Sequence, residues 1–345
     1  MAGPLTGLTI VELAGIGPGP MCSMMLGDMG ADVIRVDRTK AHVMDRLADP
    51  KFAVHNRSRR SVSVDLQSKA GVEVVLRLIE KADGMTEPFR PGVAERLGLG
   101  PDVCLALNPK LVYGRMTGWG QDGPLARAAG HDLNYVALTG LLSLAARPGE
   151  RPVLPPTVVG DAAGALGLAF GIVCALLDAR RSGHGRVVDA AIVDVVAMLG
   201  TLVQWVRASG QIDGPLPSPF HDSPFYDVYT CADGGQVTIG ALEPQFYALL
   251  LARLGLADVE PAAQYDRAAW PVLKARLTAL FVSQPRAHWC ALLEGSDVCF
   301  APVLSIAEAA AHPHNAARGI YTAAAGGGLR VAPAPRFQRL PGVPG

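Results

Sequence analysis

The chain has 345 residues, half of them hydrophobic and 18 % charged, and its 31 Lys and Arg residues balance 31 Asp and Glu residues. A chain of this length has room for roughly two domains, because a single core stops growing near 250 to 300 residues. The balanced charge favours neither nucleic acid nor an anionic membrane. We therefore expect small molecules or further subunits as partners.

The cysteines and the apolar segments exclude other classes of protein. The six cysteines are scattered, without a Cys-x-x-Cys pair or a close Cys/His cluster, so we expect neither a disulfide framework nor a bound metal. Residues 162–177 form the most apolar run, which is shorter than the roughly 18 to 20 residues that a bilayer requires. The run predicts a buried helix. The N-terminus lacks the pattern of a signal peptide, which predicts a cytoplasmic protein.

The first elements predict a βαβ unit. A strand is expected at residues 8–13, a loop rich in glycine and proline at 15–20, a helix at 21–29 and a second strand at 31–36. The loop spaces its glycines as Gly-x-Gly-x-Gly, with prolines after the second and third glycine, and Arg38 follows Asp37 where a dinucleotide site would have an acid. This spacing argues against a nicotinamide site.

The rest of the chain predicts further α/β alternation and then a smaller domain. We expect a helix at 69–81, a strand at 110–116, a long helix capped by Asp161 and ending near Arg180, a strand at 186–190 and a helix at 192–208. Beyond a segment crowded with Pro and Gly come strands at 227–230 and 236–239 and helices at 243–254 and 270–282. The sequence thus predicts a large domain at 1–190, a helix and linker at 191–224, a small domain at 225–315, and an extended return segment at 316–345.

Three residues far apart in the chain are suited to moving protons. His131 lies between Gly130 and Asp132, Asp161 follows Gly160, and Glu243 precedes Pro244. Each has a simpler explanation: a surface histidine, a helix cap, and an acid before a helical proline. If folding brings them together, they make a two-base site in which one carboxylate orients the imidazole. Free amides at the helix start beside Asp161 would then stabilise an oxyanion.

The densest basic cluster contains Arg57, Arg59 and Arg60 in one loop, together with Arg38 and Arg90. Guanidinium groups present several fixed donors to a phosphate, so this loop is a candidate site for a phosphorylated ligand. A solvated positive loop explains the same residues equally well.

Several motifs along the chain resemble those of the type III CoA-transferase (CaiB/BaiF) superfamily, and within it most closely the α-methylacyl-CoA racemases. The motifs are Gly-Ala-Asp-Val-Ile-Arg-Val at 30–36, the Asn56-Arg57 loop, Phe-Arg-Pro-Gly-Val at 89–93, Gly-Trp-Gly at 118–120 and Pro-Ala-Pro-Arg-Phe at 333–337. Two positions are typical of the racemase branch. His131 stands at the position of the tyrosine in the Gly-Tyr-Asp motif that transferases usually have, and Glu243 lies in a Leu-Glu-Pro motif.

The resemblance implies a fold and a reaction. The fold is a Rossmann-like large domain with a smaller α+β domain, in an interlocked homodimer. The reaction inverts the α-carbon of 2-methylacyl-CoA thioesters without a cofactor, CoA being part of the substrate. His131 and Asp161 would flank the carbon, and Glu243 would reach His131 across the dimer. The positions implied for CoA and the pocket are Arg38, Asn56, Arg57, Arg60, Arg90, Asp132 and Tyr135, with an amide near Asp132 on the thioester oxygen.

Two other functions stay open at this point. One is a type III CoA-transferase that uses Asp161 as its nucleophile, and the other is a CoA-binding protein without catalytic activity. The sequence also departs from the pattern of similar racemases at two places. Thr157 stands where they have an asparagine, and residues 82–88 contain Gly, Thr and Pro, which predicts a distorted edge of the sheet.

Overall fold

The computed structural model describes residues 3–39, 53–147, 149–324 and 328–337. The chain divides into two compact units. The large unit comprises Met1–Ala146, Pro152–Gly200 and Tyr321–Gly345, and the small unit comprises Arg147–Arg151 and Thr201–Ile320. Residues 191–200, which the sequence assigned to a connecting helix, belong to the large unit, and residues 201–224 belong to the small unit.

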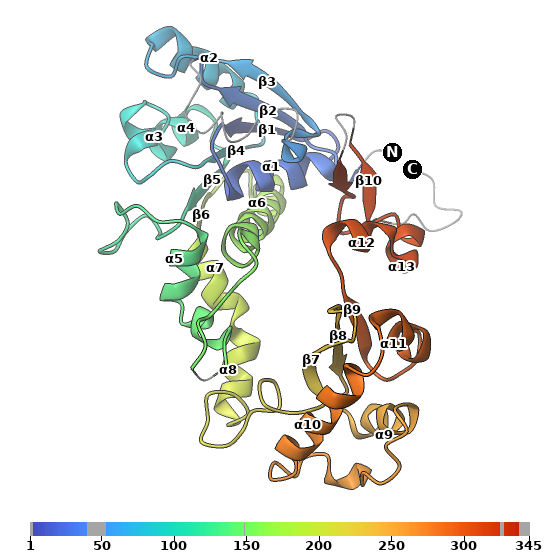
Figure 1. Cartoon of the computed structure of the whole chain (residues 1–345). Coiled ribbons are helices and arrows are strands. Elements are labelled where there is room, and N and C mark those ends of the chain that lie inside the picture. The colour runs from blue at the N-terminus through green and yellow to red at the C-terminus, as the bar shows by residue number, and fades with distance from the viewer. Residues whose placement is uncertain (1–2, 40–52, 148, 325–327, 338–345) are drawn as a thin grey trace. The chain divides into compact units, whose positions relative to one another are not determined.

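A six-stranded parallel sheet forms the centre of the large unit (Figure 1). Its strand order is β3-β2-β1-β4-β5-β6. Successive strands are therefore added first on one side of β1 and then, from β4 onward, on its other side. Ligands of such sheets bind beyond the carboxyl ends of the strands, at the point where the strand order reverses. The strands are β1 Thr9–Leu13, β2 Asp32–Asp37, β3 Arg59–Ser63, β4 Gly84–Glu87, β5 Val112–Thr117 and β6 Val187–Ala191.

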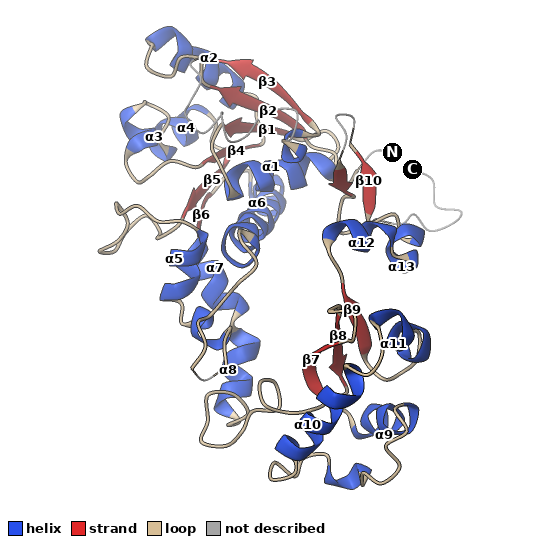
Figure 2. Cartoon of the chain, viewed as in Figure 1, coloured by secondary structure: helices blue, strands red, loops and turns tan. Residues whose placement is uncertain are grey.

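The sheet is covered on both faces by helices (Figure 2). Successive side chains of a strand point to opposite faces, so Ile10 joins one core with α1 and α6, whereas Val11 joins the other with α2. The helical segments are α1 Pro18–Asp28, η3 Val54–Asn56, α2 Lys69–Ile79, α3 Val93–Arg96, α4 Pro101–Leu107, α5 Asp132–Leu138, η4 Leu141–Leu144, η5 Val158–Ala162, α6 Ala163–Ser182 and α7 Ile192–Leu199.

Strand β4 corrects the expectation of a distorted edge at residues 82–88. It is a central strand, paired in parallel with β1 and β5, and all four of its residues are buried. Its polar side chains are satisfied from distant segments: Thr86 is hydrogen-bonded to Ser23 at 3.2 Å, and Glu87 accepts from Arg115 at 2.9 Å. Gly84 suits this tight position, because a Cβ there would lie 3.1 Å from Ile10 and 3.3 Å from the carbonyl of Val112.

Three further expectations differ from the structure. The helix expected at 192–208 is two helices, α7 and α8 (Thr201–Ala208), interrupted at Gly200. Arg59 and Arg60 begin strand β3 instead of lying in a loop. The expected extended segment near the C-terminus contains an antiparallel pair, β10 Tyr321–Ala323 and β11 Leu329–Val331, while residues 326 and 327 of the glycine run lie outside the described residues.

The segment Val158–Ser182 is long and apolar enough to cross a bilayer, judged by length and composition alone. Half of its most apolar window is buried inside the protein, as a core helix requires. Leu168 and Ile172 are fully buried against the sheet, whereas Leu166, Phe170 and Leu177 are exposed, with Phe170 at 71 %. The helix therefore has a buried face and a second apolar face that the described part of the chain leaves exposed.

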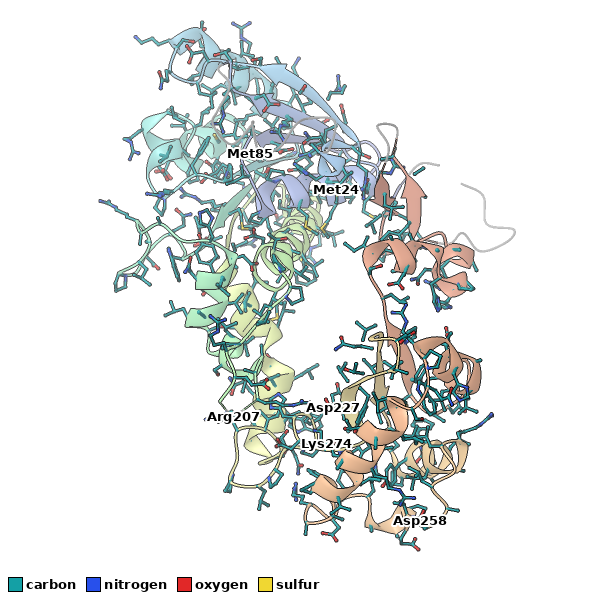
Figure 3. The ribbon with its side chains drawn as sticks, viewed as in Figure 1. Met24, Met85, Arg207, Asp227, Asp258 and Lys274 are labelled. Atoms are coloured by element: carbon teal, nitrogen blue, oxygen red, sulfur yellow. The ribbon has the colours of Figure 1, made fainter. Side chains whose placement is uncertain are left out.

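The small unit is built on an antiparallel sheet of β7 Tyr226–Thr230, β8 Gln236–Gly240 and β9 Phe300–Val303. Its aromatic core includes Phe225, Trp270 and Phe281. Figure 3 shows Lys274 beside Asp227, with which it forms an ion pair at 2.7 Å. The helical segments after α8 are α9 Pro244–Arg253, η6 Pro261–Ala263, α10 Trp270–Phe281, α11 Arg286–Leu293, α12 Ile306–Ala311 and α13 Pro313–Ala317.

Candidate active site

A cavity of about 470 Å³ lies in the large unit where the carboxyl ends of its strands meet. Its wall includes Gly17 after β1, Arg90 after β4 and Trp119 after β5. The cavity therefore occupies the reversal point of the parallel sheet, where α/β folds bind ligands. His131 and Asp161, which are 30 positions apart in the printed sequence, both line it.

The backbone around His131 is held from two sides. His131 directly precedes α5, and its amide donates to Asn134 Oδ1 at 3.0 Å. The Tyr135 hydroxyl donates to the carbonyl of Gly130. Both contacts involve residues of the first turn of α5, so the start of this helix fixes the loop that carries the imidazole. Tyr135, expected as a pocket residue, lines the cavity.

Two glycines let aromatic rings pack beside His131. The rings of Trp119 and Tyr135 meet edge to face, with centroids 4.7 Å apart. A Cβ at Gly118 would overlap the Tyr135 ring, and a Cβ at Gly130 would lie 2.8 Å from both rings. The Gly-Trp-Gly and Gly-His-Asp motifs thus meet in space, and their glycines are required for this close approach.

Asp161 lies in a π-helical turn, and this corrects the expectation that it caps the long helix. The turn is η5, which leads directly into α6, and Thr157 at its start has φ of 62°. This left-handed backbone suits glycine or asparagine and strains a β-branched residue. The carboxylate faces the loop after β1, because a Cβ at Gly17 would lie 3.3 Å from Asp161 Oδ2. Single π-turns of this kind occur frequently at functional sites.

Asp132 links the two candidate bases. It follows His131 directly, and its Oδ1 accepts from the amides of Gly160 at 2.8 Å and Asp161 at 2.7 Å. A Cβ at Gly160 would lie 2.5 Å from the same oxygen, which explains the glycine before Asp161. The expectation that amides beside Asp161 are free for an oxyanion is therefore wrong for these two amides, since a carboxylate already occupies them.

The surroundings of Asp161 raise the pKa of its carboxyl group. Burial raises the pKa of Asp161 above its ordinary value, the Asp132 carboxylate raises it further, and His131 opposes the change. Burial also raises the pKa of Tyr135, with a smaller contribution from Asp161. His131 and Asp161 are therefore close enough to interact through their charges. Such a shift in a concave site is typical of acid–base catalysts.

Glu243 lies in the small unit, at the N-cap position of α9. The residue is exposed, and its carboxylate forms no ion pair with any residue that the structure describes. Its charge acts on Tyr265 and Cys299, where it contributes to raised pKa values after the larger effect of burial. The carboxylate is thus available for a partner outside its own unit.

The basic cluster of the sequence does not assemble into one site. Arg57 pairs with Asp28 at the end of α1, through bonds of 2.9 Å to Oδ1 and 2.7 Å to Oδ2. Arg60 pairs with Asp32 at the start of β2. Both contacts lie at the amino edge of the parallel sheet, opposite the carboxyl edge that bears the cavity.

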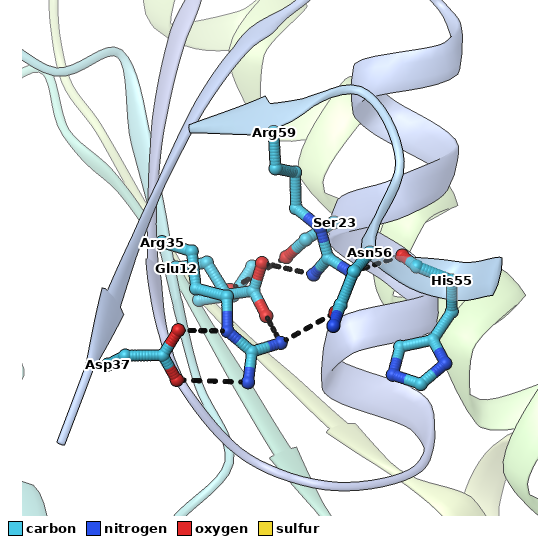
Figure 4. Close-up of polar contacts among 8 residues, drawn as sticks. Glu12, Ser23, Arg35, Asp37, His55, Asn56 and Arg59 are labelled. Carbon is cyan, nitrogen blue, oxygen red and sulfur yellow. Dashed lines mark hydrogen bonds and ion pairs between the residues drawn. The ribbon is translucent and has the colours of Figure 1, made fainter. Parts of the chain in front are cut away.

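Arg59 and Asn56 belong to a separate polar network around the buried Glu12, shown in Figure 4. Arg59 donates to Glu12 and to the carbonyl of His55, and its side chain is 2 % exposed. The Asn56 side-chain oxygen accepts from Arg35 at 3.1 Å and from Arg59 at 2.9 Å. A carboxylate buried as deeply as Glu12 needs such partners, so the network has a structural explanation.

Arg38 and Arg90 differ from the other arginines. Both are exposed at the carboxyl edge, Arg38 directly after β2 and Arg90 three residues after β4. Neither pairs with a carboxylate among the residues that the structure describes. Arg90 lines the cavity, and its charge acts on Tyr135 there.

Sequence reasoning did not assign Gly17 or Trp119 to the site, although both line the cavity. The signal for Gly17 was a glycine directly before a proline at the start of a helix, read only as a loop. Trp119 was noted only as part of a motif. In the described part of the chain, no group of His, Cys, Asp and Glu is arranged to hold a metal ion.

Comparisons with known proteins identify the family to which the chain belongs. The family model of CoA-transferase family III matches residues 5–344. The chain is 41 % identical to the α-methylacyl-CoA racemase of Mus musculus, over 99 % of this chain and 88 % of that protein. It is 30 % identical to the acetyl-CoA:oxalate CoA-transferase of Acetobacter aceti, over 94 % of this chain and 87 % of that protein.

A solved structure shows the same architecture. The crystal structure of a CaiB/BaiF family protein from Brucella suis matches with a TM-score of 0.81 at 28 % sequence identity, covering 98 % of this chain and 93 % of that one. Fold, motif pattern and family model agree over nearly the full length. The chain therefore belongs to CoA-transferase family III.

Proposed function

We propose that this protein is an α-methylacyl-CoA racemase, an enzyme that inverts the α-carbon of 2-methylacyl-CoA thioesters. The observation that carries the proposal is the presence of an imidazole and a carboxylic acid in one cavity, at His131 and Asp161. The identity to a racemase over almost the whole chain supports the same reaction.

In the proposed chemistry one base removes the α-proton and the conjugate acid of a second base delivers another proton to the opposite face. The α-hydrogen of a thioester is weakly acidic, so its removal needs a positioned base and a stabilised enolate oxygen. In one direction neutral His131 takes the α-proton, the electron pair moves onto the thioester carbonyl, and protonated Asp161 returns a proton to the opposite face. In the other direction the Asp161 carboxylate is the base and the imidazolium is the acid. The raised pKa of Asp161 supports the direction in which it donates.

The proposed reaction needs neither a redox change nor an acyl acceptor, and so we propose that it uses no cofactor. We assign the enolate oxygen to the backbone amide of Asp132. The support for this assignment is that the amide directly follows His131 in the chain, and that the carboxylate of the same residue accepts from the amide of Asp161.

For the CoA phosphates we propose Arg38 and Arg90. They carry positive charge at the edge of the sheet that bears the cavity, without a carboxylate partner among the described residues. Arg57 and Arg60 are neutralised by Asp28 and Asp32 at the other edge, and Asn56 is engaged by two arginines. These three positions, which the resemblance implied for CoA, therefore have the weaker case.

We further propose a homodimer in which Glu243 of the partner subunit contacts His131. Support comes from the exposed, unpaired carboxylate of Glu243 and from the apolar stripe of Leu166, Phe170 and Leu177 on α6. A stripe of this kind on a soluble protein is typical of a subunit interface. The cytoplasmic location stays a prediction.

Subunit complementation tests this dimer. Chains carrying His131→Ala are mixed with chains carrying Glu243→Gln under conditions of subunit exchange. A site shared between subunits predicts recovered racemisation in the mixture, because one of the two sites then has both residues intact. Activity no higher than the mean of the separate variants contradicts a shared site.

The reaction itself is tested with one pure enantiomer of a 2-methylacyl-CoA. We expect inversion without any free carboxylic acid present. Product formation that requires a carboxylate acceptor would instead show a CoA-transferase with Asp161 as nucleophile. Tight CoA binding with neither reaction would show a binding protein without catalysis.

A further inference from the structure

The backbone that carries Glu243 is held by two side chains from a later segment of the small unit. Gln264 is 3 % exposed, and its Nε2 donates to the carbonyls of Ala241 at 2.9 Å and Leu242 at 3.0 Å. The Tyr265 hydroxyl donates to the same Leu242 carbonyl at 2.6 Å. Three hydrogen bonds therefore converge on the two peptide groups directly before Glu243.

The donors themselves are anchored in the aromatic core. The indole of Trp270, which is 3 % exposed, donates to the carbonyl of Gln264 at 2.8 Å. On the other side, the Ala241 amide donates to Phe225 at 3.0 Å. The core of the small unit thus fixes Gln264, and Gln264 fixes the turn before Glu243.

The side chain of Glu243 has no comparable support. It is exposed and makes no hydrogen bond or ion pair among the described residues. Within the small unit only the direction of its Cα–Cβ bond is therefore fixed, by the backbone at the N-cap of α9 with Pro244 at the first helical position. Proline restricts this position further, because its own φ is fixed.

The Gln264 amide is used as a donor only. Both bonds are made by its nitrogen, while Oε1 is buried without a partner among the described residues. An unpartnered buried acceptor is unfavourable, so the fold retains this side chain at a cost that its donors must offset.

We infer that Gln264 and Tyr265 are positioning residues for Glu243, which they hold at the angle needed to orient the imidazole of His131. The inference rests on the proposed function of Glu243. Orientation of a catalytic group is sensitive, since a misplacement of about 1 Å can reduce a rate by about 10²-fold.

Gln264→Met removes both donors at similar side-chain volume, and Tyr265→Phe removes the third. We expect Gln264→Met to lower kcat by about 10-fold and to leave KM for acyl-CoA unchanged, because no contact with CoA is altered. Tyr265→Phe should lower kcat less. The matched control is Tyr229→Phe, which removes a hydroxyl bond to Pro224 in the same core and should leave kcat unchanged.

A double-mutant cycle with Glu243→Gln separates positioning from general stability. If Gln264 acts through Glu243, Gln264→Met should have little further effect on kcat in the Glu243→Gln enzyme. An equal loss of kcat in both backgrounds would overturn this inference and leave the proposed role of Glu243 intact. The same conclusion would follow if Gln264→Met left kcat unchanged while Glu243→Gln lowered it. An unchanged kcat for Glu243→Gln would overturn the role of Glu243 and this inference with it. If Gln264→Met does not fold, the cycle is run with Tyr265→Phe and read in the same way.

Discussion

The two edges of the parallel sheet use their polar residues in opposite ways. At the amino edge, Arg57 and Arg60 are each paired with a carboxylate of α1 or β2. At the carboxyl edge, His131, Asp161 and Arg90 line a cavity, and Arg90 has no carboxylate partner among the described residues. The charges closest together in the sequence therefore stabilise the fold, whereas the groups available to a ligand come from separate loops.

Removal of either base at the carboxyl edge should have the largest effect. His131→Ala and Asp161→Asn should each lower kcat by about 10³-fold, within the range that general acid–base catalysis contributes. His184→Ala is the matched control, since this exposed histidine precedes β6 at the amino edge. Rates of inversion measured by chiral separation of the acyl groups decide the matter. Loss of activity in His184→Ala, or its retention in His131→Ala, would contradict the difference between the edges.

The link between the two bases should come next in size. Asp132→Ala removes the acceptor of the Gly160 and Asp161 amides and should lower kcat by about 10²-fold. Asp132→Asn keeps an acceptor oxygen but removes the negative charge, so most of the activity should remain.

Asp132→Asn also gives a prediction for the dependence of the reaction rate on pH. The Asp132 carboxylate contributes to the raised pKa of Asp161, and its removal should lower that pKa. In the direction in which the Asp161 carboxylate is the base, the acidic limb of the rate profile should therefore move to lower pH. In the opposite direction, which needs protonated Asp161, the rate should begin to fall at lower pH than in the wild type. A limb that moves to higher pH would show that the charge of Asp132 does not act as stated.

A smaller effect should distinguish the arginines at the two edges. Arg38→Ala should raise KM for acyl-CoA by about 10-fold, because one charge-assisted bond to phosphate is lost. Arg60→Ala should leave KM unchanged, since its guanidinium is already paired with Asp32 at the other edge. Steady-state kinetics of the two variants, with kcat as the internal reference, compare them directly. A larger increase in KM for Arg60→Ala than for Arg38→Ala would instead place the CoA phosphates at the amino edge of the sheet.

The smallest effect concerns backbone strain at the carboxyl edge. Thr157 lines the cavity with φ of 62°, a conformation that asparagine adopts more readily. Thr157→Asn should therefore raise the free energy of unfolding by about 1 kcal/mol, as measured by denaturant titration. Thr139→Asn is the control, because φ at Thr139 is −73° and no strain is relieved. A less stable Thr157→Asn protein would mean that the threonine makes compensating contacts.

The sequence predicted the elements whose hydrophobic pattern is local. The first βαβ unit, α2, β5, β6 and the β7–β8 pair lie where periodicity placed them, within a few residues. Strand β4 was not predicted as a central strand because it buries the sequence Gly-Met-Thr-Glu. Its polar side chains are hydrogen-bonded by Ser23 and Arg115, which come from other segments. Local patterns carry no information about such partners.

The site shows the same division. The residue types at 131 and 161 predicted proton transfer, and in the structure both residues line one cavity. The π-turn around Asp161 and the bonds from Asp132 to residues 28 and 29 positions later were not predictable, because they depend on how α5 packs against η5. The charge cluster was misleading for the same reason, since its carboxylate partners lie at the end of α1 and the start of β2, far from the arginines in sequence.

The most direct test of two bases in one cavity is deuterium incorporation during inversion of a single enantiomer in deuterated water. With the wild-type enzyme at early times, inverted product should carry one α-deuterium and no acceptor acid should be needed, while Asp161→Asn and His131→Ala should form almost no inverted product. Inversion without deuterium uptake, or undiminished inversion in either variant, would contradict removal of the α-proton by one of these residues and delivery of a proton by the other.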